Sequence, residues 1–566
     1  MRFSLNRSRT SRAAALPCVV GFIAMVLAAR LCPGQETSGT ANPTYPVKGV
    51  VLNSVTHQPV ARGLVDAHEG AVLTDNDGRF ELSLPAGVAQ ITVKRPGYGE
   101  RGRGSNHSVQ VGANMPPLTF NLVPEALITG QVTLSTADAA DGIRVMAYRR
   151  RIIEGREQWM MQGTAMTNSD GGFRIAELPP GHYLLYTQPA RDGDGSLGPS
   201  GRPGRVAATY GYPASYYPGV ADISGASLLT LTAGQHAEAD FTLTRQEFYP
   251  VTVTIANHEM GGGMNLQVRD RNGRQMGFPV RWNPQLGTAG VNVPTGSYFM
   301  EGRRRGEGQL YGRVEFTVSG APLTGLSMAL LPLHAVPVTV RKVFTATSNS
   351  GGGIQPVEND SSAGLNISLT PAEEFFGQNG GGGGLRQAEG TSDGSSFEID
   401  NVGPGRYWVE PSPFEGYVSS ITSGGVDLAR DPLVVGAGST SPPIEVTLRN
   451  DSGTISVQLA TGEIGEQAGT ASVGEQQQTY VYAIPMFASA GPIKLGGMQG
   501  SGQTTISGLA PGSYRVIAFD TPQEIDFHSS EGLAKYAGQG ETVTVEASGS
   551  VNVQLDVIHA SNADAE

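Results

Sequence analysis

FRIAELPPGHYLL, residues 173–185, has the pattern of two β-strands joined by a tight turn. Apolar residues alternate with polar ones before the turn, as they do in a strand with one buried face. Pro180 fixes φ near the value that the first central position of a type II turn needs, and Gly181 accepts the positive φ of the second. Tyr183 follows in the next strand, so the stretch predicts strand, turn and strand.

The same frame occurs twice more without any slip in register. The copies are Pro404, Gly405 and Tyr407, and Pro511, Gly512 and Tyr514. Two looser copies, LPAG (84–87) and VPTGSY (293–298), have one residue between the proline and the glycine. The glycines of the five copies, at positions 87, 181, 296, 405 and 512, are 94, 115, 109 and 107 residues apart. A repeat of this period predicts five similar structural units.

Each unit has the alternating apolar pattern and the turn residues of a β-sandwich, and helical periodicity is nearly absent. We therefore expect an all-β fold, a tandem array of about five antiparallel β-sandwich domains of immunoglobulin or transthyretin type after an N-terminal signal peptide. The expected boundaries are 1–34 for the signal peptide and 44–124, 125–246, 247–335, 336–450 and 451–560 for the sandwiches. The third and fourth domains diverge, and Gly-rich insertions interrupt the fourth, so their boundaries stay open.

The N-terminal segment has the features of a secretory signal. Four arginines precede an uncharged, mostly apolar stretch, Cys18–Ala29, which is shorter than the ~20 residues that a spanning helix needs. We expect an exported protein that is periplasmic, on the cell surface or secreted, with no membrane span in the mature chain. The only cysteines, Cys18 and Cys32, lie in this segment, so the sandwiches contain no disulfide framework. The net charge of −12 argues against nucleic acid as a partner.

A second turn signal, TDNDGRF (74–80) and TNSDGGF (167–173), precedes the Pro-Gly frame. Asp-Gly supplies the left-handed position of a tight hairpin. A calcium loop that began at Asp75 would need glycine at its sixth position and glutamate at its twelfth, where the chain has Phe80 and Ala86. We therefore predict turns here.

These residues resemble the carboxypeptidase regulatory-like domain, a transthyretin-like sandwich of the carbohydrate-binding-like superfamily. The resemblance covers residues 47–87 and 167–185 best, and YYPGVADISGASLLTLTAGQHAEADFTL (216–243) is similar to the tail of such repeats in large exported bacterial proteins. It implies a repeated sandwich fold and carries no catalytic residue across. A regulatory part of a carboxypeptidase system is the remote alternative that the family name suggests.

The catalytic and metal-binding patterns that the sequence suggests lack the further features that such sites need. His528 and Glu531 have the spacing of a zinc pair in metallocarboxypeptidases, but the chain has no room for the α/β domain of such an enzyme. Lys48, Glu81 and Asn121 are the residue types of the isopeptide crosslinks in some adhesin domains, but the trio is not repeated in the second unit. We predict a non-enzymatic protein with no catalytic residue, metal site or cofactor.

The best ligand-binding candidate is TYGYPASYYPG (209–219), where the aromatic residues are Tyr210, Tyr212, Tyr216 and Tyr217. Planar rings on a loop can stack on sugar rings, and carbohydrate is the favoured ligand class. The alternative is that these tyrosines pack as a lid over one end of the sandwich. Tyr183, Tyr407 and Tyr514 are instead expected to be buried corner residues. The partner would be a polysaccharide or a cell-surface protein, and the alternative function is a structural spacer or protein-interaction scaffold.

Overall fold

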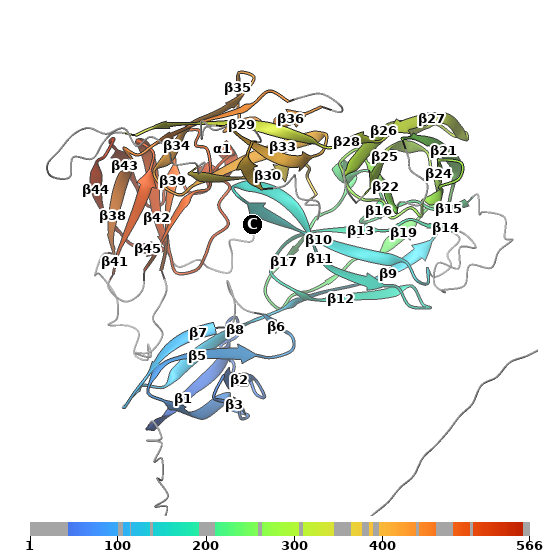
Figure 1. Cartoon of the computed structure of the whole chain (residues 1–566). Coiled ribbons are helices and arrows are strands. Elements are labelled where there is room, and N and C mark those ends of the chain that lie inside the picture. The colour runs from blue at the N-terminus through green and yellow to red at the C-terminus, as the bar shows by residue number, and fades with distance from the viewer. Residues whose placement is uncertain are drawn as a thin grey trace, which may run out of the picture. The chain divides into compact units, whose positions relative to one another are not determined.

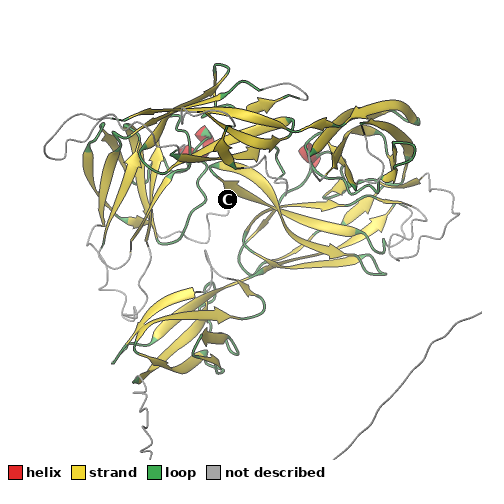
Figure 2. Ribbon diagram, viewed as in Figure 1, coloured by secondary structure: helices red, strands yellow, loops and turns green. Residues whose placement is uncertain are grey.

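The computed structural model describes residues 43–99, 106–113, 115–135, 140–191, 210–257, 263–304, 309–344, 364–375, 384–388, 396–436, 441–459, 479–498 and 502–558. This part of the chain is built almost wholly of β-strands, with one short α-helix and one 3₁₀ turn (Figures 1 and 2). The strands form successive pairs of facing sheets, so the predicted tandem array of β-sandwiches is confirmed. The predicted boundaries between the sandwiches remain predictions.

The first sandwich packs the sheet β4-β1-β8-β6 on the sheet β3-β2-β5-β7. Its strands are β1 (Thr44–Asn53), β2 (Leu64–Ala67), β3 (Gly70–Leu73), β4 (Arg79–Pro85), β5 (Gly87–Lys94), β6 (Tyr98–Gly99), β7 (Asn106–Val111) and β8 (Leu118–Pro124). The core follows the period-two pattern of the sequence, and the rings of Phe80 and Phe120 stack inside it with centroids 5.7 Å apart.

The second sandwich is formed by β11-β10-β13-β16, with β17 beside β13, and by β12-β9-β18, with β19 also beside β9. A small sheet, β14-β15-β20, adjoins them. The elements are β9 (Ala126–Leu134), β10 (Arg144–Ile153), β11 (Arg156–Met166), β12 (Gly172–Leu178), β13 (Gly181–Thr187), β14 (Ala190–Arg191), β15 (Tyr210–Tyr212), β16 (Ser215–Tyr216), the 3₁₀ turn η1 (Ile223–Gly225), β17 (Leu229–Leu231), β18 (His236–Glu238), β19 (Phe241–Leu243) and β20 (Gln246–Glu247).

The third sandwich packs β23-β24-β21-β27 on β22-β25-β26-β28. Its strands are β21 (Tyr249–Ala256), β22 (Met264–Asp270), β23 (Arg281–Asn283), β24 (Thr288–Val293), β25 (Gly296–Arg304), β26 (Leu310–Val318), β27 (Leu323–Ala329) and β28 (Leu331–Pro332). Its core continues without a break into side chains on the outer face of β10 and β13, so one apolar cluster serves two sandwiches.

The fourth sandwich has a wide sheet, β31-β32-β29-β37-β34-β35, and a narrow one, β30-β33-β36. Its strands are β29 (His334–Val343), β30 (Leu365–Pro371), β31 (Leu385–Gln387), β32 (Ser396–Val402), β33 (Gly405–Pro413), β34 (Tyr417–Ser423), β35 (Val426–Asp427), β36 (Leu433–Val435) and β37 (Ile444–Arg449). The divergent sequence of this unit thus still gives two sheets around one core.

The fifth sandwich packs β41-β38-β44 on β40-β39-β42-β43, with β45 beside β42. Its elements are β38 (Gly453–Leu459), β39 (Thr479–Pro485), β40 (Lys494–Met498), β41 (Gln503–Leu509), β42 (Gly512–Phe519), α1 (Ser530–Ala534), β43 (Glu541–Val545), β44 (Ser550–Leu555) and β45 (Val557–Ile558). The segment that carries α1 covers the outer face of β39 and β42 with a second, smaller apolar cluster.

The Pro-Gly frame turns the chain from one sheet of a sandwich to the other. β12, before the turn, lies in the sheet of β9, whereas β13, after it, lies in the sheet of β10, and β41 and β42 are divided in the same way. Gly181 and Gly512 have φ of +147° and +154°, which is far from the φ of about +80° in a type II turn. Such values are essentially restricted to glycine. The sequence located the turn correctly, but the turn is a corner between sheets.

The sheets differ from the predicted antiparallel pattern in one repeated way. In every sandwich the first strand pairs in parallel with a strand from the C-terminal end of the unit, as in β1 with β8 and β38 with β44. The other three cases are β9 with β18 and β19, β21 with β27, and β29 with β37. The period-two pattern predicts a strand but not the direction of its neighbour.

Candidate functional site

Three tyrosines of the repeated frame occupy equivalent corners. Tyr183, Tyr407 and Tyr514 are all buried. Each hydroxyl donates to the carbonyl oxygen four residues earlier, at 2.5 Å to Pro179, 2.9 Å to Gly403 and 2.8 Å to Ala510. The arrangement is that of a tyrosine corner, in which the ring fills the core and the hydroxyl fixes the upstream backbone. Burial raises the pKa of Tyr407 to about 12.

The four tyrosines of the candidate ligand loop do not form a common surface. Tyr212 lies in the core of the second sandwich, and Tyr216 is 1% exposed in the apolar cluster that joins the second and third sandwiches. Tyr217 packs its ring edge against Phe241, with centroids 5.6 Å apart. Only Tyr210 is exposed (41%), and the Arg245 guanidinium lies 4.4 Å from the centre of its ring. Stacking of these tyrosines on a sugar ring stays a prediction. Of the four, only Tyr210 has an exposed ring that could take part in it.

Tyr216 instead contacts a buried arginine from the third sandwich. The Arg274 guanidinium lies 3.5 Å from the ring centre of Tyr186 and 4.3 Å from that of Tyr216. Its Nη2 atom forms an ion pair with Asp270 at 2.9 Å, and only 4% of the side chain is exposed. The guanidinium packs against both neighbouring rings and pairs with a carboxylate, and both kinds of contact favour the cation. The contact fastens the third sandwich to the outer face of the second.

A turn missed by the sequence reasoning positions Arg274. In DRNGR (270–274), the Asp270 carboxylate accepts hydrogen bonds from the backbone N–H groups of Asn272 and Arg274, both at 3.0 Å. In the second sandwich, the Asn168 side-chain oxygen accepts the same pair of hydrogen bonds from the backbone N–H groups of Asp170 and Gly172. The shared signal is Asp or Asn three residues before glycine. It could have revealed this turn in the third unit, where no Asp-Gly-x-Phe pattern exists.

A second buried ionic group lies next to this turn. Arg269 Nε is 2.9 Å from Glu301 Oε2, and the Tyr311 hydroxyl donates to Glu301 Oε1 at 2.8 Å. Glu373, from the fourth sandwich, lies 3.7 Å from Arg269, and burial raises its pKa. Since both oxygens of Glu301 accept hydrogen bonds, this carboxylate is held as a structural ion-pair partner.

The hairpin of β10 and β11 reaches the fourth and fifth sandwiches. Trp159 N–H donates to the Glu374 carbonyl at 2.8 Å. The Arg156 guanidinium lies 3.8 Å from the ring centre of Trp408. Both contacts join the edge strand β11 to the fourth sandwich.

The tip of the same hairpin meets the fifth sandwich in a contact that we call the clasp, defined as Arg151, Ile152, Gly155, Glu524 and Phe527. Arg151 forms an ion pair with Glu524, whose other oxygen accepts the Ile152 N–H at 3.1 Å. Gly155 has φ of +74°, and a Cβ atom there would lie 2.2 Å from the Phe527 ring. Glycine is thus required both by the backbone and by the close approach.

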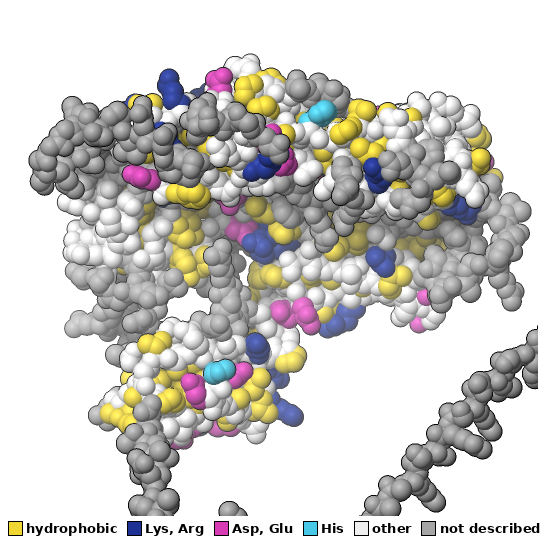
Figure 3. Space-filling model, viewed as in Figure 1, with side chains coloured by type: hydrophobic (Ala, Val, Ile, Leu, Met, Phe, Trp, Pro, Cys, Tyr) yellow, Lys and Arg dark blue, Asp and Glu magenta, His cyan; other side chains and the backbone are white. Residues whose placement is uncertain are grey.

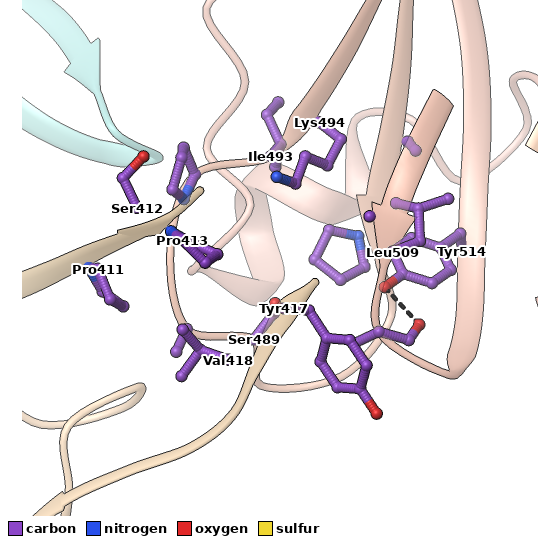
Figure 4. Close-up of a pocket in the computed structure, with 16 residues that line it drawn as sticks. Pro411, Ser412, Pro413, Tyr417, Val418, Ser489, Ile493, Lys494, Leu509 and Tyr514 are labelled. Atoms are coloured by element: carbon purple, nitrogen blue, oxygen red, sulfur yellow. Dashed lines mark hydrogen bonds between the residues drawn. The ribbon is translucent and has the colours of Figure 1, made fainter. Parts of the chain in front are cut away.

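A pocket lies between strands of the fourth and fifth sandwiches (Figure 4). Tyr417, Tyr514 and Lys494 contribute to its wall, together with several prolines, and the Tyr514 hydroxyl is bonded within it. Its cavity volume is about 50 Å³. Pockets for small organic ligands usually enclose about 300–1,000 Å³. This one accommodates a few water molecules and no sugar ring.

The isopeptide trio is not assembled. Lys48 Nζ lies 3.3 Å from Glu81 Oε1, in an ion pair whose side chains are 60% and 57% exposed. Asn121 pairs with Leu52, which is four positions along β1 from Lys48, or about 13 Å at the rise of a strand. Within the described ranges, no three His, Cys, Asp or Glu side chains are grouped as metal ligands.

The surface carries no single dominant charge on the face shown in Figure 3, where acidic, basic and apolar side chains are interspersed. Among the residues that the structure covers, no helix is long and apolar enough to cross a membrane.

Comparisons with known proteins do not assign the chain to a family. No family model and no curated protein matches it. A solved streptococcal ancillary pilin is 11% identical, with 51% of this chain and all of the pilin aligned and a TM-score of 0.18. The full-length RrgB pilus protein of Streptococcus pneumoniae is 9% identical, covering 77% of this chain and 98% of that protein (TM-score 0.14). The shaft pilin SpaA of Lactobacillus rhamnosus GG is 10% identical over 37% of this chain and 98% of its own (TM-score 0.14). No functional conclusion rests on similarities of this size.

Proposed function

We propose that this protein is an exported, non-catalytic scaffold whose sandwiches are fastened to one another. The observation that carries the proposal is the β10–β11 hairpin, which contacts the fourth sandwich through Trp159 and Arg156 and the fifth through the clasp. The Arg274 contact adds the third sandwich. A chain of independent binding modules would not need buried ions and aromatic rings between its modules.

The use of the aromatic residues supports a scaffold over a ligand-binding protein. The rings of three tyrosines are buried at corners of the sandwiches, where their hydroxyls bond the backbone: Tyr183, Tyr407 and Tyr514. Tyr216 contributes to the contact between the second and third sandwiches. The pocket in Figure 4 is too small for a sugar. The residues that look most like a recognition surface in the sequence are therefore those that hold the structure together.

The family and the domain limits belong to the same proposal. We infer that the sandwiches are of the carboxypeptidase regulatory-like type, on the strength of the repeated turns, and that they span 44–124, 125–246, 247–335, 336–450 and 451–560. The parallel pairing of the first strand with a strand from the C-terminal end of each unit supports these limits.

The proposal is tested by measuring a distance between the second and fifth sandwiches. Cys18 and Cys32 are replaced by serine, and spin labels are attached to cysteines at the exposed positions Gln162 and Glu541. A fastened scaffold gives a narrow distance distribution in pulsed electron spin resonance. A broad distribution, typical of freely jointed modules, would contradict the proposal.

The matched control uses the ion pair of the clasp. Glu524→Arg places two like charges together and should broaden the distribution. The double variant Arg151→Glu with Glu524→Arg reverses the pair and should restore the narrow distribution in large part. Recovery in the double variant separates loss of the contact from general damage to the fold.

Carbohydrate binding at Tyr210 is the second candidate, because this ring is exposed beside a cationic side chain. Affinity electrophoresis against a panel of polysaccharides would show retardation that Tyr210→Ala removes. Phe414→Ala, at an aromatic residue that is 76% exposed elsewhere, is the matched control and should change nothing. Equal mobility in every gel would eliminate this candidate.

A further inference from the structure

In each sandwich the chain enters and leaves at opposite ends of one hydrogen-bonded ladder. In the fifth sandwich, Thr454–Leu459 of β38 pairs in parallel with Ser550–Leu555 of β44 over six consecutive positions. In the fourth, Val338–Val343 pairs with Ile444–Arg449, again over six. Because the two strands run in the same direction, the start of the first strand and the end of the last lie at opposite ends of the ladder.

This geometry determines how tension applied to the two ends of a sandwich is transmitted to its strands. Tension between the two ends draws the first and last strands past each other along their length. All the hydrogen bonds of the ladder are then strained together, and the strands cannot separate until several break at once. If the same strands were antiparallel, the chain would enter and leave at one end, and tension would break the bonds one at a time.

The first strand is also held on its other side. β38 lies between β41 and β44, and β29 lies between β32 and β37. Its inward side chains are fixed in the core: Ile455 is 0% exposed and Val457 2%. Sliding the strand would therefore break a second ladder and pull packed side chains from their sites. The same central position recurs for β1, β9 and β21.

We propose that the protein bears mechanical tension, with each sandwich acting as a unit that resists shear between its ends. This inference rests on the proposed scaffold function and adds a property that a scaffold does not require. Residues 33–566 contain no cysteine, so no disulfide contributes to this resistance. The five parallel ladders and the cores beneath them carry the load.

Direction-dependent force spectroscopy on the whole chain tests the proposal. With Cys18 and Cys32 replaced by serine, handles are attached at cysteines introduced for Ser452 and Asp556, which flank β38 and β44 at opposite ends. A second variant carries its handles at Ser452 and Ala547, near the same end of the ladder, so that pulling unzips it. We expect the first pair to need clearly the higher force to unfold the fifth sandwich. Equal forces in the two directions would overturn the proposal.

Proline substitutions at two neighbouring positions of β44 test whether the hydrogen bonds of the ladder resist the tension. Only alternate residues of an edge strand donate their N–H to the neighbouring strand. Of Val551→Pro and Asn552→Pro in the edge strand β44, one removes a hydrogen bond to β38 and the other leaves it. One variant should therefore shorten the lifetime of the fifth sandwich under constant force by about tenfold more than the other. Equal lifetimes would count against the ladder as the resisting element.

The two proposals can fail separately. A narrow spin-label distribution with direction-independent unfolding would keep the scaffold and reject the tension-bearing role. A broad distribution with strong direction dependence would reject the fastened scaffold, and leave single sandwiches that resist shear.

Discussion

Removing the hydroxyl groups of the corner tyrosines offers three parallel tests of the fold. Tyr183→Phe, Tyr407→Phe and Tyr514→Phe each delete one hydrogen bond, at 2.5, 2.9 and 2.8 Å, while the buried ring is kept. A net hydrogen bond contributes about 0.5–1.5 kcal/mol, and a buried acceptor left without a donor costs about 1–3 kcal/mol. We therefore expect each substitution to lower the free energy of unfolding of its own sandwich by about 1–2 kcal/mol.

Peptide-resolved hydrogen exchange under native conditions measures this loss for each sandwich separately. The amides of β13, β33 and β42 should lose protection in the respective variants, and the other sandwiches should change by less than about 0.5 kcal/mol, the usual range for distant surface sites. Tyr210→Phe, at an exposed ring, is the control and should change none of them. Unchanged protection in all three corner variants would refute the view that these hydroxyls hold the corners.

Three further predictions address the contacts and the titrating tyrosine. Gly155→Val should open the clasp, because its Cβ would lie 2.2 Å from the Phe527 ring, and the spin-label distance between the second and fifth sandwiches should broaden; an unchanged distance would contradict the contact. Arg274→Ala should destabilise the third sandwich by about 3 kcal/mol, since it leaves Asp270 without its cation, and Arg274→Lys should recover only part, as judged from exchange in β22 and β25. The pKa of Tyr407 is raised by burial to about 12, so the fourth sandwich should lose stability as the pH rises from about 10 to 12, where the unfolded chain ionises and the folded one does not. Alkaline titration of Tyr407→Phe, followed by exchange in β33, should show a smaller loss than the parent.

Most of what could be predicted about the fold came from the repeated Pro-Gly frame. Its alternating residues correctly indicated strands such as β12 and β13, and its spacing gave the number of sandwiches. The type II geometry was wrong, because a local pattern cannot show that Gly181 turns the chain between two sheets with φ of +147°. The third unit lacked the expected Asp-Gly signal because its turn has Asn272-Gly273 in that place, while Asp270 accepts the turn's hydrogen bonds as Asn168 does in the second unit.

The tyrosine loop shows the limit of prediction for a candidate site. Four aromatic residues in a Pro/Gly loop are equally consistent with a stacking surface and with packing, because composition does not say which faces another sheet covers. The third sandwich brings Arg274 against Tyr216 from more than fifty positions away, and Tyr212 turns into the core of its own sandwich.

The sequence by itself determined the strands and the positions of the turns between them, because these depend on residues close together in the chain. The tertiary structure alone decided two things. One is the parallel pairing of first and last strands, which joins residues about a hundred positions apart, as in Ser456 with Asn552. The other is the fastening of one sandwich to another, by Arg274, whose guanidinium packs against the rings of Tyr186 and Tyr216, and by the clasp, where Arg151 pairs with Glu524. Only folding brings these distant residues within a few ångströms of each other.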